Sequence, residues 1–214
     1  MWVYFLQLPI SSYNPDISEH KNRLRMITQS GSIAILFDLI EFFVRHPNTS
    51  EKIKQMIAES FINARAAYRV VDNRIIVIAT GEQAEAVQQA IDTAGTLCPA
   101  ARSHLVGGGH AARQGDWAGS VRESIHAVEA AARLIEPSAK TLGEALNKLE
   151  RNNHLHGGMK AGLSALYGYT NDERGVRHSL QDDAAKVDET DAIFMLGACA
   201  AFVSYLLARS RGSG

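Results

Sequence analysis

This sequence has little cysteine and almost no net charge, and each shortage argues against a class of protein. Its two cysteines, Cys98 and Cys199, match no metal-ligand spacing and no C-x-x-C motif. We therefore interpret both as reduced core residues of a cytoplasmic protein rather than as parts of a disulfide framework. The formal net charge is −1, so the chain as a whole has no attraction to nucleic acid or membrane. Any nucleic-acid binding must come from a local basic cluster or an assembled oligomer.

Several catalytic signatures are also missing. The chain has no G-x-S-x-G elbow, and no lysine with Ser or Thr follows the glycines 107–109 at P-loop spacing. Those glycines fall inside a predicted helix, so either the helix breaks there or another backbone packs closely against it. His104 with His110, and His154 with His156, have no clear third ligand in the sequence. We therefore predict helix-cap or surface roles for these histidines, and no metal or cofactor.

The first 96 residues mix two periodicities. β-Branched runs at 68–71 and 74–79 are separated by Asp72-Asn73, which predicts a tight hairpin. Apolar residues at helical spacing surround this hairpin. We predict helices at residues 32–44, from residue 50 onward and at 82–94. Residues 1–96 are therefore expected to form a small α+β accessory domain.

From residue 97 onward no strand signal remains, which predicts an all-helical bundle over residues 97–214 and a mainly α chain overall. Thr141 and Glu144 have the spacing of a capping box. Residues 192–208 carry no formal charge, but Gly197 and several alanines dilute them, so a buried bundle helix is expected rather than a membrane span. The expected helices are 99–112, 118–135, 140–152, 156–167 and 187–209.

The expected helix at 118–135 carries two parallel stripes on a helical wheel. The first stripe is apolar and consists of Val121, Ile125, Val128, Ala132 and Ile135. The second stripe consists of Arg122, His126, Glu129 and Arg133. One interpretation is a solvated face in which Arg122 pairs with His126 and Glu129 with Arg133. The other makes Glu129 a partner, at the edge of the core, for a cationic group across the bundle.

A second cluster occupies residues 170–178, between two expected helices. It holds two arginines, one histidine and two carboxylates, which is a sufficient set for metal-independent RNA cleavage. A histidine removes the proton of the 2′-hydroxyl, and a guanidinium stabilises the charge that develops on the phosphate. The alternative is that Arg177 and His178 bind Glu129 or Asp172 and merely hold the helices together.

These segments resemble abortive-infection proteins of the AbiJ type, a phage-defence family. The similarity covers nearly the whole chain, in the same order and spacing, including the accessory region before the bundle. The matching segments are 67–80 (AYRVVDNRIIVIAT), 120–129 (SVRESIHAVE), 141–146 (TLGEAL), 166–173 (LYGYTNDE), 175–178 (GVRH) and 194–206 (FMLGACAAFVSYL).

The resemblance implies a C-terminal HEPN-like fold, pairing as a homodimer, and ribonuclease activity. HEPN ribonucleases carry an arginine and a histidine separated by four to six residues, whereas Arg174 and His178 enclose three and Arg177 directly precedes His178. On this basis His178 is the expected general base or acid, with Arg177 and Arg174 on the scissile phosphate. The expected supporting residues are Glu129, Glu173, Asp172, Thr170 and Tyr169.

A second function is also consistent with the resemblance. Some HEPN domains are inactive and serve in dimerisation or nucleotide binding. The alternative expectation is therefore a non-catalytic dimerisation, nucleotide-binding or sensor module. In either case we expect a cytoplasmic homodimer with RNA or a nucleotide as its partner, and no membrane.

Overall fold

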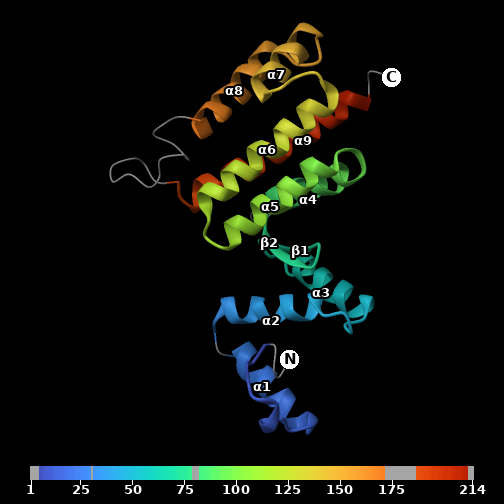
Figure 1. Ribbon diagram of the computed structural model, residues 1–214, viewed down its shortest axis with the longest axis vertical. Helices are drawn as coiled ribbons and strands as arrows, with labels where there is room; N and C mark the ends of the chain where they lie inside the picture. The colour runs from blue at the N-terminus through green and yellow to red at the C-terminus, as the bar shows by residue number, and fades with distance from the viewer. Residues whose placement is uncertain (1–4, 30, 79–81, 172–186, 212–214) are drawn as a thin grey trace. The chain divides into compact units, whose positions relative to one another are not determined.

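The computed structural model describes residues 5–29, 31–78, 82–171 and 187–211, and within them the chain is mainly helical with one two-stranded hairpin (Figure 1). This confirms the predicted fold class. The elements are a 3-10 helix at Ile10–Ser12, α1 (Ile17–Gln29), α2 (Ile33–Arg45), α3 (Glu51–Asn63), β1 (Tyr68–Val71), β2 (Arg74–Val77), α4 (Glu82–Leu97), α5 (Pro99–Arg113), α6 (Trp117–Ile135), α7 (Leu142–Arg151), α8 (Gly157–Asn171) and α9 (Glu189–Arg211).

The chain forms two compact units that divide at the hairpin. The first holds α1 to α3 and the hairpin tip, Val70–Ile75. The second holds the base of the hairpin and α4 to α9. By compactness α4 thus belongs with the later helices, because it packs on α5 and α9. The sequence instead predicted α4 as the last helix of the accessory domain, residues 1–96. Compactness does not test which parts of the chain fold independently, so that domain boundary stays a prediction.

The predicted hairpin is present, and its two-residue turn has the expected chemistry. Asp72 and Asn73 adopt φ of 50° and 60°, the left-handed values that a two-residue primed turn requires. In the first unit the buried Glu41 of α2 accepts a hydrogen bond from the Ile75 backbone N–H at 2.8 Å. Its second oxygen lies 2.7 Å from Arg45 Nη2. Glu41 therefore joins α2 to the hairpin tip.

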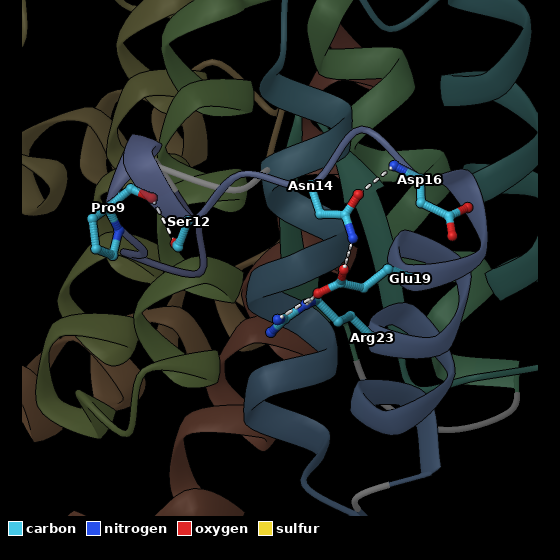
Figure 2. Close-up of polar contacts among 6 residues, drawn as sticks. All are labelled: Pro9, Ser12, Asn14, Asp16, Glu19 and Arg23. Carbon is cyan, nitrogen blue, oxygen red and sulfur yellow. Dashed lines mark hydrogen bonds and ion pairs between the residues drawn. The ribbon is translucent and has the colours of Figure 1, made fainter.

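Polar contacts hold the start of α1, a helix that the sequence analysis did not predict. Asn14 accepts a hydrogen bond from the Asp16 backbone N–H at 3.0 Å and donates one to Glu19 at 2.6 Å (Figure 2). Arg23 binds Glu19 at 2.8 Å, and this contact is the main reason that the Glu19 pKa lies below its ordinary value. None of the residues of α1 is buried, and these contacts brace the start of the helix locally.

In the second unit α6 packs against α5, α7, α8 and α9, and Figure 1 shows α6 and α9 running alongside each other. Four residues of the predicted apolar stripe of α6, Val121, Ile125, Val128 and Ala132, are at most 3% exposed, and the fifth, Ile135 at the helix end, is half-buried. Burial on one continuous stripe is what joins an amphipathic helix to a bundle. The core of this unit therefore follows the helical period found in the sequence.

The last helix, α9, is long and apolar. Within the described residues, Glu189–Ser210 has the length and composition that crossing a membrane requires, with mean hydropathy 1.8 over its most apolar window. Core helices of soluble proteins meet the same criterion. Here α9 packs on α4, α5 and α6. Its buried side chains recur every three to four residues, at Ala192, Met195, Leu196, Cys199, Ala200, Val203, Leu206 and Leu207.

The glycines of α5 fit close packing rather than a helix break. The helix runs without interruption through residues 107–109. A Cβ on Gly109 would lie 2.6 Å from the Val77 carbonyl oxygen, which is closer than real Cβ contacts allow. A Cβ on Gly108 would lie 3.2 Å from Ser124 Oγ and 3.3 Å from the Ser120 carbonyl oxygen. Of the two predicted explanations, close approach of another backbone is therefore correct.

Candidate functional site

Three potential metal-ligating side chains meet where α5 packs on α6. His104 Nδ1 of α5 lies 2.8 Å from Glu123 Oε2 of α6. The ring of His126, also on α6, stands edge-on to the ring of His104 with 5.3 Å between centroids. One nitrogen or oxygen atom from each of the three residues falls within 4.8 Å of the others. We call His104, Glu123 and His126 the His–Glu–His cluster.

The helical geometry explains how the cluster forms. Glu123 and His126 are three positions apart on α6, so both point to the same face of that helix. On α5, Gly107 follows His104 by one turn. A Cβ at Gly107 would lie 3.0 Å from Glu123 Oε2, so the missing side chain leaves room for this carboxylate beside α5. The glycine thus allows Glu123 to reach His104.

The cluster borders a hollow of about 640 Å³ in the second unit. Both imidazoles, Glu129 and Arg133 contribute to its wall, and the start of α5 supplies apolar surface. Arg133 Nη1 lies 3.9 Å from Glu129 Oε1 on the same helix. The hollow therefore combines two imidazoles, an ion pair and an apolar floor, a common composition for a small-ligand site.

Chemically, this arrangement offers two possibilities. Imidazole nitrogens and a carboxylate oxygen are ligands for divalent transition metals. Alternatively, the hollow could hold an anion, because Arg133 adds a positive charge to its wall. A second hollow of about 430 Å³ lies along α2 in the first unit. Its Glu41 and Arg45 already bind each other, and Glu41 also accepts from Ile75, so these groups have a structural role.

Most of the predicted catalytic residues lie outside the part of the chain that the structure describes. This holds for Arg174, Arg177, His178, Asp172 and Glu173, and for the side chain of Thr170. Their assignment as a ribonuclease site therefore stays a prediction. Tyr169 and Glu129 are the two predicted residues whose side chains are described.

Tyr169 stands near the end of α8 and contacts the start of α9. The carboxylate of Asp191 on α9 lies near enough for its charge to act on the Tyr169 hydroxyl. Partial burial raises the pKa of Tyr169 above its ordinary value, and the negative charge of Asp191 raises it further. Because residues 172–186 connect α8 to α9, this contact brings together the two ends of the segment that carries Arg174, Arg177 and His178.

Glu129 makes the local ion pair of its first interpretation, whereas Arg177 and His178, the cationic groups of the second, lie outside the described residues. Its ionic partner in the described structure is Arg133 on its own helix, as the four-residue spacing predicted. Its side chain is 26% exposed and lies on the wall of the hollow. Glu129 therefore stands beside the His–Glu–His cluster, at a place the sequence did not indicate.

The cluster was not predicted, because His104 was paired only with His110 when metal ligands were sought in the sequence. The available signal was the Glu123–His126 spacing on one helix together with Gly107 one turn after His104 on another. Neither feature reveals on its own that these two faces meet. Only the packing of α5 on α6 brings Glu123 and His126 close to His104.

Comparison with protein-family models, with curated proteins and with solved structures finds no match for this chain. The similarity to abortive-infection proteins thus rests on the sequence segments described above.

Proposed function

We propose that this chain is a phage-defence protein of the abortive-infection class whose helical bundle cleaves RNA without a metal ion. The observation that carries the proposal is that the negative charge of Asp191, near the start of α9, helps to raise the pKa of Tyr169 near the end of α8, so the two helix ends lie close together. The connection between these helix ends, residues 172–186, carries Arg174, Arg177 and His178, which are the cationic and proton-transferring groups of the proposed site. The AbiJ-type sequence segments support the same assignment.

In the proposed reaction, His178 accepts the proton of the ribose 2′-hydroxyl, and the 2′-oxygen attacks the adjacent phosphorus. The bond from phosphorus to the 5′-oxygen breaks, and that oxygen takes up a proton. The products are a 2′,3′-cyclic phosphate and a free 5′-hydroxyl. Arg177 and Arg174 stabilise the charge on the phosphate oxygens, and Glu173 and Glu129 orient the cationic groups.

The protein acts as a homodimer in this proposal, with two copies of the basic segment facing one RNA. The poor burial of α8 supports an interface there. Among the α8 side chains that the structure describes, Leu163 alone is fully buried, while Met159 and Tyr169 are both more than a third exposed. The same observation favours a second candidate, a cytoplasmic dimerisation or nucleotide-binding module without catalysis.

RNA cleavage by the purified, tag-free protein in EDTA tests the first candidate. We expect His178→Ala to lower the cleavage rate at least about 100-fold, because positioned proton transfer contributes on the order of 10²–10⁴-fold. His156→Asn is the matched control and should keep full activity, because it removes an exposed imidazole of the same unit and keeps an acceptor for the Gly158 backbone N–H, which His156 binds at 3.1 Å. Undiminished cleavage by His178→Ala would rule out the assignment. Nucleotide or RNA binding without turnover, measured by titration calorimetry, would favour the module instead.

A further inference from the structure

We propose that His104, Glu123 and His126 form a binding site for a divalent transition metal ion of the zinc class. The site uses none of the residues assigned to RNA cleavage, so it goes beyond the proposed function. It joins α5 to α6 through side chains that are 19 to 22 positions apart in sequence, and all three are accessible from solvent.

The distances suit a single ion after small side-chain rotations. Zinc binds nitrogen and oxygen at about 2.0–2.2 Å in tetrahedral geometry, which places two ligand atoms of one ion about 3.4 Å apart. The His104–Glu123 contact at 2.8 Å is slightly shorter than this, and the outer limit of the cluster, 4.8 Å, is longer. His126 is exposed, so its ring has room to rotate toward the other two.

The donor set selects the kind of metal. Two imidazoles and one carboxylate suit zinc and its neighbours among the transition metals, whereas magnesium and calcium prefer sites made of oxygen ligands. Three protein ligands leave one tetrahedral position for water or another small ligand, as in catalytic rather than structural zinc sites. Both imidazoles border the hollow of about 640 Å³, so this position is accessible from there.

A plain structural role is the competing explanation for the cluster. The pair of His104 with Glu123 is sufficient to brace α5 against α6, and Gly107 then serves only to make room for it. That explanation assigns nothing to His126. A metal site requires His126, because two protein ligands hold a zinc ion far more weakly than three. The contribution of His126 therefore distinguishes the two explanations.

The experiment is metal titration of the tag-free full chain. Zn²⁺ binding, followed by competition with a chromophoric chelator, should saturate at one ion per chain. Co²⁺ at the same site should give the strong visible absorption of a four-coordinate ion. We expect His126→Ala and Glu123→Gln each to lower the affinity at least about 100-fold, since even outer-shell changes cost about 10–100-fold.

His156→Asn serves as the matched histidine control and should bind Zn²⁺ like the wild type. Because metal ligands must be deprotonated, the affinity should also fall as the pH is lowered. His126 is exposed, so its replacement leaves the fold intact, as circular dichroism will verify. No saturable binding by the wild-type chain, or equal affinity in wild type and His126→Ala, would overturn the proposal.

This outcome is separable from that of the proposed function. RNA cleavage is measured in EDTA and depends on His178, whereas metal affinity is measured without RNA and depends on His126. A negative result in the cleavage experiment leaves the metal-site proposal standing, and a negative metal titration leaves the cleavage proposal standing.

Discussion

Individual glycines in the bundle helices occupy two different environments. At Gly109 of α5 a methyl group would meet the Val77 carbonyl oxygen at 2.6 Å. At Gly197 of α9 a methyl group would meet no atom within 4 Å, apart from its own helix backbone and chain neighbours. Gly109 is therefore required by packing, whereas Gly197 only lowers the intrinsic stability of its helix.

We predict opposite effects for alanine at these two positions. Gly109→Ala should lower the free energy of unfolding by about 1–3 kcal/mol, because the backbone of the hairpin must move to admit the methyl group. Gly197→Ala should raise it by up to about 1 kcal/mol, the difference in helix propensity between alanine and glycine. Chemical denaturation of both variants measures the effects. Equal or greater stability of Gly109→Ala would contradict the close approach.

The start of α7 shows how far residue-level prediction reaches. Thr141 accepts a hydrogen bond from the Glu144 backbone N–H at 3.2 Å, as the capping-box spacing predicted. Glu144 accepts from the Lys140 backbone N–H at 2.8 Å, one residue before the predicted donor. This contact is the main reason that the pKa of Glu144 is lowered. The sequence thus identified the capping residues, and the local backbone decided which donor is used.

At the scale of elements, the contact between α8 and α9 depends on pH. The pKa of Tyr169 is raised by burial and then by Asp191, so the folded chain holds this proton more tightly than the unfolded chain. Its contribution to stability is therefore fully present below the unfolded tyrosine pKa, about 10. It is lost as the pH rises through the higher, folded pKa.

We predict that this tyrosine ionises above pH 10 in the folded protein. Tyrosinate absorbance is followed against pH in the wild type and in Tyr169→Phe. Subtracting the second curve from the first gives the ionisation midpoint of Tyr169. Asp191→Asn is the matched control, since it keeps an acceptor but removes the charge, and should shift the midpoint downward. A midpoint at or below 10 in the wild-type difference curve would contradict the contact.

Helix boundaries followed from local signals where those signals were strong. The predicted helices at 99–112 and 118–135 correspond to α5 at Pro99–Arg113 and α6 at Trp117–Ile135. Pro99 at the first turn and the Asp116 cap, which accepts from the Gly119 backbone N–H, fix these starts. In contrast, α1 is mostly polar, and its few apolar residues gave too weak a helical signal in the sequence.

At the scale of the whole chain, burial is distributed unevenly. Neither α1 nor α3 contains a buried residue, whereas α6 has nine, and α9 buries a residue at every turn of its apolar face. Elements with few buried apolar contacts open locally at low free energy. The two compact units therefore differ in the amount of core that protects them.

We predict a matching pattern of hydrogen exchange. The amides of α6 and α9 should exchange slowest, and those of α1 and α3 should exchange first, when exchange is followed by mass spectrometry of peptic peptides. Gly109→Ala should accelerate exchange in α5 and α6 and leave α1 unchanged, because α1 belongs to the other compact unit. Protection of α1 equal to that of α6 would contradict the uneven distribution.

The sequence by itself determined most of the secondary structure of this protein, α1 excepted, because turns, caps and apolar periodicity depend on residues within a few positions of each other. The Asp72-Asn73 turn and the Val121–Ala132 stripe are examples. Only the tertiary structure decided that His104 meets Glu123 and His126, since that contact depends on which faces of α5 and α6 pack together and on the space left by Gly107. Helical periodicity specifies a buried face, but it does not specify the partner of that face.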